Sequence, residues 1–283
     1  MSTPFVSTEL AARIDRAEAR LTASIGHAVR ATQTPVDADA FVEEIGGGVA
    51  VYTGPSSPMN KMIGIGFGSA FPEDQLQGIE ERFKSRRAPL QAEVSTLADL
   101  GIASSLARRG YMLQGFENIL GRAIGRQDVE EHESAIEVGV SNNGEDFARW
   151  LDVAVTGFLH PDQQGVQAEP LPPRELLEAA LQNFAGVPGF RRYFAWLDGH
   201  VAGVATLRLD DGLAQLCGAA TLPAFRRRGV QTALLRRRLA DALEEGCDLA
   251  LMTTQPGSKS QENGQRQGFA LLYSRALLVK DPE

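Results

Sequence analysis

The chain has 283 residues, 43% of them hydrophobic and 23% charged, and a net charge of −8. This length holds two ordinary domains, and the composition is typical of a soluble globular protein. The acidic balance argues against non-specific nucleic-acid binding, no apolar run is long enough to span a membrane, and the first residues resemble no secretion signal. Two cysteines and four scattered histidines lack metal-ligand spacing, so no metal site is expected. We therefore predict a cytoplasmic protein without nucleic-acid or membrane partners.

Helical and extended patterns alternate along the first half of the chain. Apolar residues recur every three or four positions from Leu10 to Val29, which predicts an amphipathic helix. The glycine-rich run at 64–68 lacks the spacing of a dinucleotide-binding fingerprint and is interpreted as a strand end. The other elements expected here are a short helix at 41–45, strands at 49–52 and 61–67, a helix at 74–87, a strand at 89–95, a helix at 97–109, and two short strands within 111–120 that separate at Gly115.

The second half is rich in turn signals. Residues 126–132 are polar and charged and predict a linker, which places two domains at 1–128 and 133–283. Asp198-Gly199 between two extended runs indicates a tight hairpin. The expected elements are a strand at 135–140, helices at 146–158 and 176–184, strands at 190–197, 201–209 and 213–222, a helix at 230–245, a strand at 248–254, a helix at 258–267, and strands at 269–273 and 275–280.

The two halves repeat the same order of elements. Placing Gly110-Tyr111 on Gly268-Phe269, an offset of 158 residues, brings helices, strands and stops of the two halves into register. Few identities are shared, but the lengths and the order agree. We expect each repeat to be one domain.

A basic turn joins the strand expected at 213–222 to the helix expected at 230–245. It contains Arg226-Arg227-Arg228-Gly229 in an otherwise acidic chain. The first N–H groups of a helix lack partners and the helix dipole adds positive charge there, so the turn is a candidate anion site. Gly229 lets the backbone approach a ligand closely. An arginine-rich loop that only solvates a helix start is the alternative. Arg236-Arg237-Arg238 is predicted to be a second local positive spot.

Two sequence patches resemble one protein family. The pattern R-x-x-G-x-Q at Arg226, Gly229 and Gln231 resembles the acyl-CoA pyrophosphate loop of the GCN5-related N-acetyltransferases, the GNAT family, where the usual pattern is Q/R-x-x-G-x-G/A. Gln231 departs from the small residue at the last position. A second patch resembles the family's C-terminal helix and the start of the strand after it: Ser260-Gln261-Glu262-Asn263, Arg266, Gly268-Phe269 and Tyr273. The resemblance implies an α/β (α+β) protein with two GNAT-like domains, each a mixed, mostly antiparallel twisted sheet flanked by helices.

The resemblance also implies where acetyl-CoA binds. The cofactor lies in a notch where the strands at 213–222 and 248–254 separate. At the offset of 158 residues the basic turn falls on 68–73, which holds no basic residue, so only the second domain is expected to bind the cofactor. For Asn263 and Arg266, an exposed polar helix face is the alternative. The implied contacts are Ala220, Thr221 and Leu222 at the pantetheine arm, Arg226, Arg227, Arg228, Gly229, Val230, Gln231 and Thr232 at the pyrophosphate, and Asn263 and Arg266 on the last helix.

The sequence assigns no catalytic acid or base. Many family members carry a tyrosine proton donor four residues before the Gly-Phe pair, and here that position is Gly264. Tyr273 and Ser260 are possible substitutes, although a tyrosine between strands is more often structural and the serine also suits a helix cap. Cys217 has no histidine near it in the sequence and is expected to be a small buried residue.

The predicted function is an acyl-CoA-dependent N-acetyltransferase that moves an acetyl group directly from acetyl-CoA to an amine of a small molecule or peptide. The first domain is a degenerate repeat that closes one side of the acceptor site. A non-catalytic acyl-CoA-binding or regulatory protein is the alternative, which the missing tyrosine favours. Transfer to a hydroxyl group, or transfer of a longer acyl chain, is a third reading. The sequence identifies neither the acceptor nor the oligomeric state.

Overall fold

The computed structural model describes residues 5–32, 39–68, 71–129, 134–141, 144–162, 173–185, 187 and 189–282. The chain forms two compact units. The N-terminal unit comprises Phe5–Ile119 together with Leu271–Glu283, and the C-terminal unit consists mainly of Leu120–Ala270. No helix in the described part of the chain is long and apolar enough to cross a membrane.

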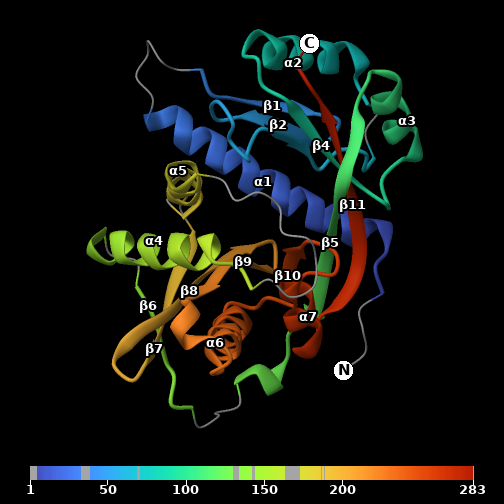
Figure 1. Ribbon diagram of the computed structural model, residues 1–283. Coiled ribbons are helices and arrows are strands. Elements are labelled where there is room, and N and C mark those ends of the chain that lie inside the picture. Colours follow the sequence, from blue (N-terminus) through green and yellow to red (C-terminus); the bar gives the residue numbers. More distant parts are fainter. Residues whose placement is uncertain are drawn as a thin grey trace. The chain divides into compact units, whose positions relative to one another are not determined.

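The N-terminal unit is a sheet with helices on both faces (Figure 1). Its elements are α1 (Thr8–Thr32), β1 (Phe41–Ile45), β2 (Gly48–Tyr52), β3 (Lys61–Ile63), α2 (Glu73–Ser85), β4 (Leu90–Ser95), α3 (Leu100–Arg108), β5 (Met112–Ala123), whose last residues belong to the C-terminal unit, and β11 (Ala270–Lys280). The strand order is β1-β2-β3-β4-β11-β5. β3 and β4 are parallel, while the pairs β1–β2, β2–β3 and β4–β11 are antiparallel.

Alternation along β2 divides the core of the N-terminal unit between its helices. Ala50 and Tyr52 pack in one cluster with Phe83 of α2. Val51 points to the other face and packs with Ala19 of α1. Successive side chains of a strand point to opposite faces, so a strand that is apolar at every position needs a helix on each side.

A buried ionic network fastens α1 to β11. Arg275 is completely buried, with its Nε 3.0 Å from Asp15 Oδ1 and its Nη2 2.5 Å from Glu18 Oε2. The Tyr273 hydroxyl donates to Asp15 Oδ2 at 2.5 Å. Removing one partner of such a buried pair typically costs about 3–5 kcal/mol. The network therefore helps to hold the C-terminal strand in the N-terminal unit.

The same network reaches β3, β4 and β5. Lys61 Nζ lies 2.7 Å from Glu93 Oε1, and Glu93 Oε2 lies 3.7 Å from Arg275 Nη1. Burial, and then the negative charge of Glu93, raise the pKa of Glu117 to about 7 against the attraction of Lys61. The cluster holds more carboxyl groups than cationic groups: Asp15, Glu18, Glu93 and Glu117 against Lys61 and Arg275.

The strands of the C-terminal unit also have helices on both faces. Besides the end of β5 it contains β6 (Glu137–Val140), α4 (Gly144–Leu159), α5 (Arg174–Ala185), β7 (Phe190–Leu197), β8 (His200–Asp210), β9 (Leu213–Thr221), α6 (Val230–Glu244), β10 (Leu249–Thr254), α7 (Lys259–Arg266) and the 3-10 turns Arg126–Val129 and Pro223–Phe225. The strand order is β5-β10-β9-β8-β7-β6. β9 and β10 are parallel, and β6 to β9 form an antiparallel meander.

Alternation along β7 again separates two cores. Tyr193 and Ala195 pack with Leu234 of α6, whereas Phe194 packs with Trp150 of α4. Figure 1 shows α4 and α6 on opposite faces of these strands. Most of the apolar surface of the unit is thus buried between one sheet and the helices on either face, which is the mixed α/β fold predicted.

The two halves of the chain share a run of five elements. β3–α2–β4–α3–β5 in the first half corresponds to β9–α6–β10–α7–β11 in the second. In each run the strands before and after the first helix pair in parallel. Leu90 and Leu249, which begin β4 and β10, are within one residue of the predicted offset. The last strand of the second run, β11, pairs with β4 of the first. The domain limits predicted from the sequence, 1–128 and 133–283, remain a prediction.

Two local predictions in the first half are wrong. Residues 41–45 form strand β1 rather than a helix, because Gly46 and Gly47 take φ values of +55° and +83° and turn the chain back, so that Phe41 pairs with Tyr52. The strand expected at 61–67 ends at Ile63, since the following Gly64 takes φ +80°.

The short strands predicted in pairs are single strands. Residues 111–120 lie almost wholly in β5, which continues through Gly115, and residues 269–280 lie in β11, which continues through Ser274. The Ser274 carbonyl accepts from the Thr96 N–H at 2.9 Å, and its hydroxyl donates to Asn118 Oδ1 at 2.7 Å. A glycine or serine weakens an isolated strand, but neighbouring strands keep these two continuous.

Candidate functional site

β9 and β10 separate towards their carboxyl ends. Their parallel pairing covers only Leu213 to Gln215 of β9. β9 continues to Thr221 and β10 to Thr254, and no further register pair joins the two within the described residues. On its other edge β9 stays paired with β8 up to Thr221. The main chain of β9 beyond Gln215 is therefore not engaged by β10.

A bulge interrupts β9 in this unpaired stretch. Ala220 pairs with Val204 and Cys217 with Thr206, so that two residues, Gly218 and Ala219, face a single residue of β8. Gly218 takes φ +45°, which a glycine adopts without strain. Bulges turn main-chain groups out of the ladder and recur next to active sites.

The turn between β9 and α6 carries a row of N–H groups. Arg227 has φ +61°, and Gly229, the N-cap of α6, has φ +88°. The first helical hydrogen bond runs from the Ala233 N–H to the Gly229 carbonyl at 3.0 Å. No described residue accepts a hydrogen bond from the main-chain N–H groups of residues 227–232. Together with the positive end of the α6 dipole, these donors have the arrangement that binding of an anion requires.

Arg226 does not point into this site. Its Nε donates to the Thr221 carbonyl at 3.3 Å, and its Nη2 donates to the carbonyls of Gly157, at 3.4 Å, and His160. These carbonyls belong to the end of α4, where a cation satisfies unpaired acceptors. Its own N–H donates to the Pro223 carbonyl at 3.3 Å. Arg226 therefore braces the loop against α4.

The remaining loop side chains are arranged in different ways. Arg228 forms an exposed ion pair of 2.7 Å with Asp198 in the β7–β8 hairpin. Arg227 has no hydrogen-bond or ion-pair partner among the described residues. Gln231 donates from Nε2 to Thr221 Oγ1 at 2.8 Å, which directs its amide towards the end of β9. The departure from a small residue at this position is thus accommodated within the turn.

The end of β9 is packed closely on both sides. A Cβ placed on Gly157 of α4 would lie 2.7 Å from the Ala220 Cβ, and one placed on Gly203 of β8 would lie 2.7 Å from the Ala220 carbonyl oxygen. The Leu222 N–H donates to the Ala202 carbonyl at 3.0 Å. Of the positions predicted for the pantetheine arm, Leu222 thus has its amide occupied within the sheet.

The comparison with protein families matches residues 157–269 to a model described as "Acetyltransferase (GNAT) family". Residues 157–269 are a GNAT domain. This segment contains the separating strands, the bulge, the N–H row and the last helix. A search of curated proteins finds no match to this chain.

Solved GNAT structures resemble the whole chain in fold. A GCN5-related N-acetyltransferase from Kribbella flavida is 17% identical with a TM-score of 0.63, covering 94% of this chain and 95% of the other. One from Sphaerobacter thermophilus is 13% identical with a TM-score of 0.55, covering 100% and 98%. A tandem GNAT protein from the clavulanic acid biosynthesis pathway is 13% identical with a TM-score of 0.57, covering 98% and 97%. Because the likeness spans nearly the whole chain, the first half shares the GNAT fold.

The last helix of the GNAT domain exposes both residues predicted to face the cofactor. Asn263 is exposed and has no hydrogen-bond partner among the described residues. Arg266 forms an ion pair with Glu262, which also lies 2.6 Å from Lys259 Nζ. Hydrogen bonding from Lys259 is the main cause that lowers the pKa of Glu262. The helix is capped by Ser258, whose Oγ accepts from the Gln261 N–H at 3.2 Å.

The side of Gly264 where a side chain would begin is occupied by Met252. The glycine is buried in α7, and a Cβ built on it would lie 2.5 Å from Met252 Sδ and 3.3 Å from Leu120 Cδ1. A larger residue would require the flexible Met252 thioether to move and would press on Leu120. The thioether of Met252 on β10 thus lies where the Cβ of a residue at the usual position of the GNAT proton donor would be.

The other candidate proton donors are placed unequally. Tyr273 lies in the N-terminal unit, where burial raises the pKa of its phenol well above its usual range and its hydroxyl is committed to Asp15. Ser260 is exposed on the first turn of α7. Cys217 is half-buried beside the bulge, and its Sγ lies 3.6 Å from the Gln215 carbonyl oxygen.

The burial of two polar residues of the C-terminal unit was not predicted from the sequence. Arg238 is only 2% exposed and donates to the carbonyls of Thr206 and Leu234, each at 3.1 Å, so it is not the surface charge predicted. Burial lowers its pKa to about 10, which leaves it cationic at neutral pH. Its spacing of four residues from Leu234 and from Ala242 is the signal that places it on the buried face of α6. Thr254, at the end of β10, has a buried hydroxyl without a described partner.

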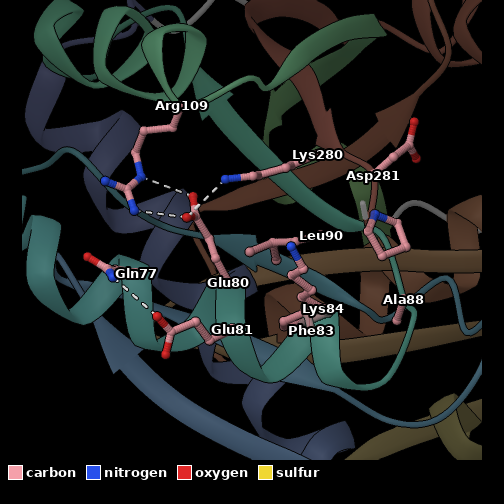
Figure 2. Close-up of a pocket in the computed structure, with 11 residues that line it drawn as sticks. Gln77, Glu80, Glu81, Phe83, Lys84, Ala88, Leu90, Arg109, Lys280 and Asp281 are labelled. Carbon is pink, nitrogen blue, oxygen red and sulfur yellow. Dashed lines mark hydrogen bonds and ion pairs between the residues drawn. The ribbon is translucent and has the colours of Figure 1, made fainter.

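The N-terminal unit contains a cavity of about 340 Å³ between α2 and the ends of β4 and β11. Figure 2 shows Arg109 and Lys280 pointing at Glu80 on its wall. The Glu80 carboxylate accepts from Arg109 Nε and Nη2 at 3.1 and 2.8 Å, and it lies 3.0 Å from Lys280 Nζ. Burial acts to raise the pKa of Glu80, but these hydrogen bonds outweigh it and lower the pKa. Arg109 and Lys280 of this wall are therefore both paired with Glu80.

Proposed function

We propose that the C-terminal unit binds acetyl-CoA and transfers its acetyl group to a primary amine of a small molecule or peptide. The observation that carries this proposal is the row of unpaired N–H groups at residues 227–232, set on the loop that follows the separating strand β9. The match of residues 157–269 to the GNAT family supports acyl-CoA chemistry in general. The acceptor amine and the direct-transfer mechanism belong to the proposal, as does the cytoplasmic location.

The residues present fit the three parts of acetyl-CoA. A pyrophosphate needs several converging donors without a competing carboxylate, and the first turn of α6 contains no acidic residue. The pantetheine arm carries amides, which match the main chain of β9 beyond Gln215. The bulge at Gly218 and Ala219 turns main-chain groups towards the point where the thioester is expected. These positions form one continuous track along β9 into α6.

The proposed reaction relies mainly on positioning. Bound acetyl-CoA supplies an acetyl group activated as a thioester. Holding an amine against such a group in a fixed geometry replaces a collision between two molecules and can contribute about 7–11 kcal/mol to the barrier reduction. The N–H groups at the bulge are the donors for the carbonyl oxygen as charge develops on it. As the C–N bond forms and the C–S bond breaks, solvent takes the proton that the amine loses and supplies one to the leaving sulfur, because position 264 has no side chain that could do so.

The alternative is a protein that binds acyl-CoA without turnover. The occupied position at Gly264 favours it, because the usual acid is absent and its place is filled. Both readings need the cofactor site and differ only in chemistry. Release of free thiol from acetyl-CoA over a panel of polyamines, aminoglycosides and peptide N-termini separates them. Mass spectrometry of any product distinguishes transfer to nitrogen from transfer to a hydroxyl group.

Gly229→Asp tests the cofactor site itself. The new carboxylate would lie in the N–H row and repel phosphate, and like-charge contacts cost several kcal/mol, so CoA affinity in calorimetry should fall about 100-fold or more. Gly246→Asp is the matched control: it follows the other end of α6, takes φ +76°, and has no heavy atom within 4 Å of the new Cβ. Both variants bear the same backbone strain. Equal CoA affinity in the two variants would refute the site.

A further inference from the structure

We infer that Met252 sets the length of the acyl chain that this protein accepts. The inference rests on the proposed acyl-CoA site and assigns a role to a residue within it. Met252 Sδ lies 2.5 Å from the Cβ that a tyrosine would have at position 264, where many GNAT proteins carry their proton donor. A flexible apolar side chain there limits how far an acyl chain can extend into the site, and it cannot donate a proton.

The position of Met252 on β10 supports this role. The pairing of β10 with β9 ends at Leu251, and Met252 is the next residue. Its side chain is half-buried, whereas the residues before it on β10 are buried. The thioether thus lies at the inner end of the stretch where the two strands are not paired. An acyl group carried inward along β9 from the basic turn would meet the thioether where the two strands begin to separate.

The contact with Gly264 fixes the direction of the thioether. A Cβ at position 264 would come within 2.5 Å of Met252 Sδ and 3.8 Å of its Cε, so the thioether lies directly against the glycine backbone. Leu120 closes the same space from β5, at 3.3 Å from that Cβ. The wall is therefore apolar throughout, and a glycine at 264 is what lets the methionine occupy it.

Shortening Met252 should lengthen the preferred acyl chain. Met252→Ala removes three heavy atoms in a row, Cγ, Sδ and Cε, from an apolar wall. Each methylene of an acyl chain that enters the vacated space is worth about fourfold in affinity. Butyryl-CoA has two more methylenes than acetyl-CoA, so its affinity relative to acetyl-CoA should rise by about 15-fold.

The test measures binding of CoA, acetyl-CoA and butyryl-CoA by calorimetry to the full-length wild type and three variants. Met252→Ala should raise the butyryl-to-acetyl affinity ratio about 15-fold. Met252→Val should raise this affinity ratio by a smaller factor. Because valine suits a strand, this variant keeps the test available if the alanine variant does not fold. Met252→Leu is the matched control, because it refills the wall without sulfur and should leave the ratio unchanged. Affinity for CoA itself should be the same in all four proteins.

Two failures are distinguishable. An unchanged ratio in the alanine and valine variants, with CoA still bound, would overturn the role of Met252 and leave the cofactor site intact. Absence of CoA binding in the wild type would overturn the cofactor site and this inference with it. A ratio that rises equally in the leucine control would show that the sulfur, rather than the filled volume, is what matters, and would also overturn the inference.

Discussion

Glu117→Gln should stabilise the protein at alkaline pH and have little effect near pH 4.5. Glu117 lies among Glu93 of β4, Lys61 of β3, Glu18 of α1 and Arg275 of β11. Burial is the largest cause that raises its pKa to about 7 from an ordinary value of 4.5, and Glu93 adds repulsion. Ionisation of Glu117 therefore costs free energy in the native state that it does not cost in the unfolded chain.

The sign and size follow from proton linkage. A carboxyl group whose pKa is raised in the native state stabilises that state below its unfolded pKa, and the contribution is lost as pH rises through the native pKa. The relevant window is thus pH 4.5 to 7. One pKa unit corresponds to about 1.4 kcal/mol, so the full difference is about 3 kcal/mol. Glutamine cannot ionise, and the variant avoids this loss.

Urea denaturation at pH 5 and pH 8 measures the effect. The wild type should lose stability between the two pH values relative to Glu117→Gln, by about 2.5 kcal/mol. Glu44→Gln, the same chemical change at an exposed position of β1, is the control and should follow the wild type at both pH values. Parallel curves for the wild type and Glu117→Gln would refute the reasoning that Glu117 carries the buried penalty.

Three further substitutions test the packing described above. Asp15→Ala leaves Arg275 buried without its main partner and should lower the free energy of unfolding by about 3–5 kcal/mol, measured by urea denaturation. Thr254→Val removes a buried hydroxyl that has no described partner and should raise stability by about 1 kcal/mol; a loss of stability would show that a water or ligand satisfies it. Gly264→Tyr must displace Met252 and should destabilise the protein by about 1–3 kcal/mol or more, with no gain in thiol release.

Local patterns in the sequence were sufficient for most of the C-terminal unit. The strand at 213–222, the basic turn and the helix at 230–245 are contiguous, so the turn at Gly229 with its unpaired N–H groups depends on interactions between near neighbours. The hairpin at Asp198-Gly199 is of the same kind. Such features are encoded within a few residues by turn chemistry and periodicity, which is why they could be predicted.

Features made by distant residues could not be predicted in this way. Tyr273 and Asp15 are 258 positions apart, and nothing local indicates that the last strand joins the N-terminal unit. The contact of Met252 with Gly264 is likewise tertiary: the sequence shows that the tyrosine is missing but not what takes its place. Arg226 matches the family motif in sequence, yet its guanidinium is drawn to the unpaired carbonyls at the end of α4.

The first turns of α2 and α6 differ in charge. α2 and α6 hold equivalent places in the repeated runs, but α2 has Glu73 and Asp74 in its first turn and α6 has no acidic residue there. Carboxylates at this end stabilise a helix by about 0.3–1 kcal/mol each. Glu73 is further held by the Ser105 hydroxyl at 2.5 Å.

The N-terminal unit therefore neutralises the positive end of its own helix, and an external phosphate there would meet repulsion. The C-terminal unit leaves the equivalent dipole and its N–H groups without a carboxylate, which stabilises α6 less until an anion arrives. A bound anion should consequently stabilise the C-terminal unit more than the N-terminal unit. This asymmetry supports the proposal that only the C-terminal unit binds the cofactor.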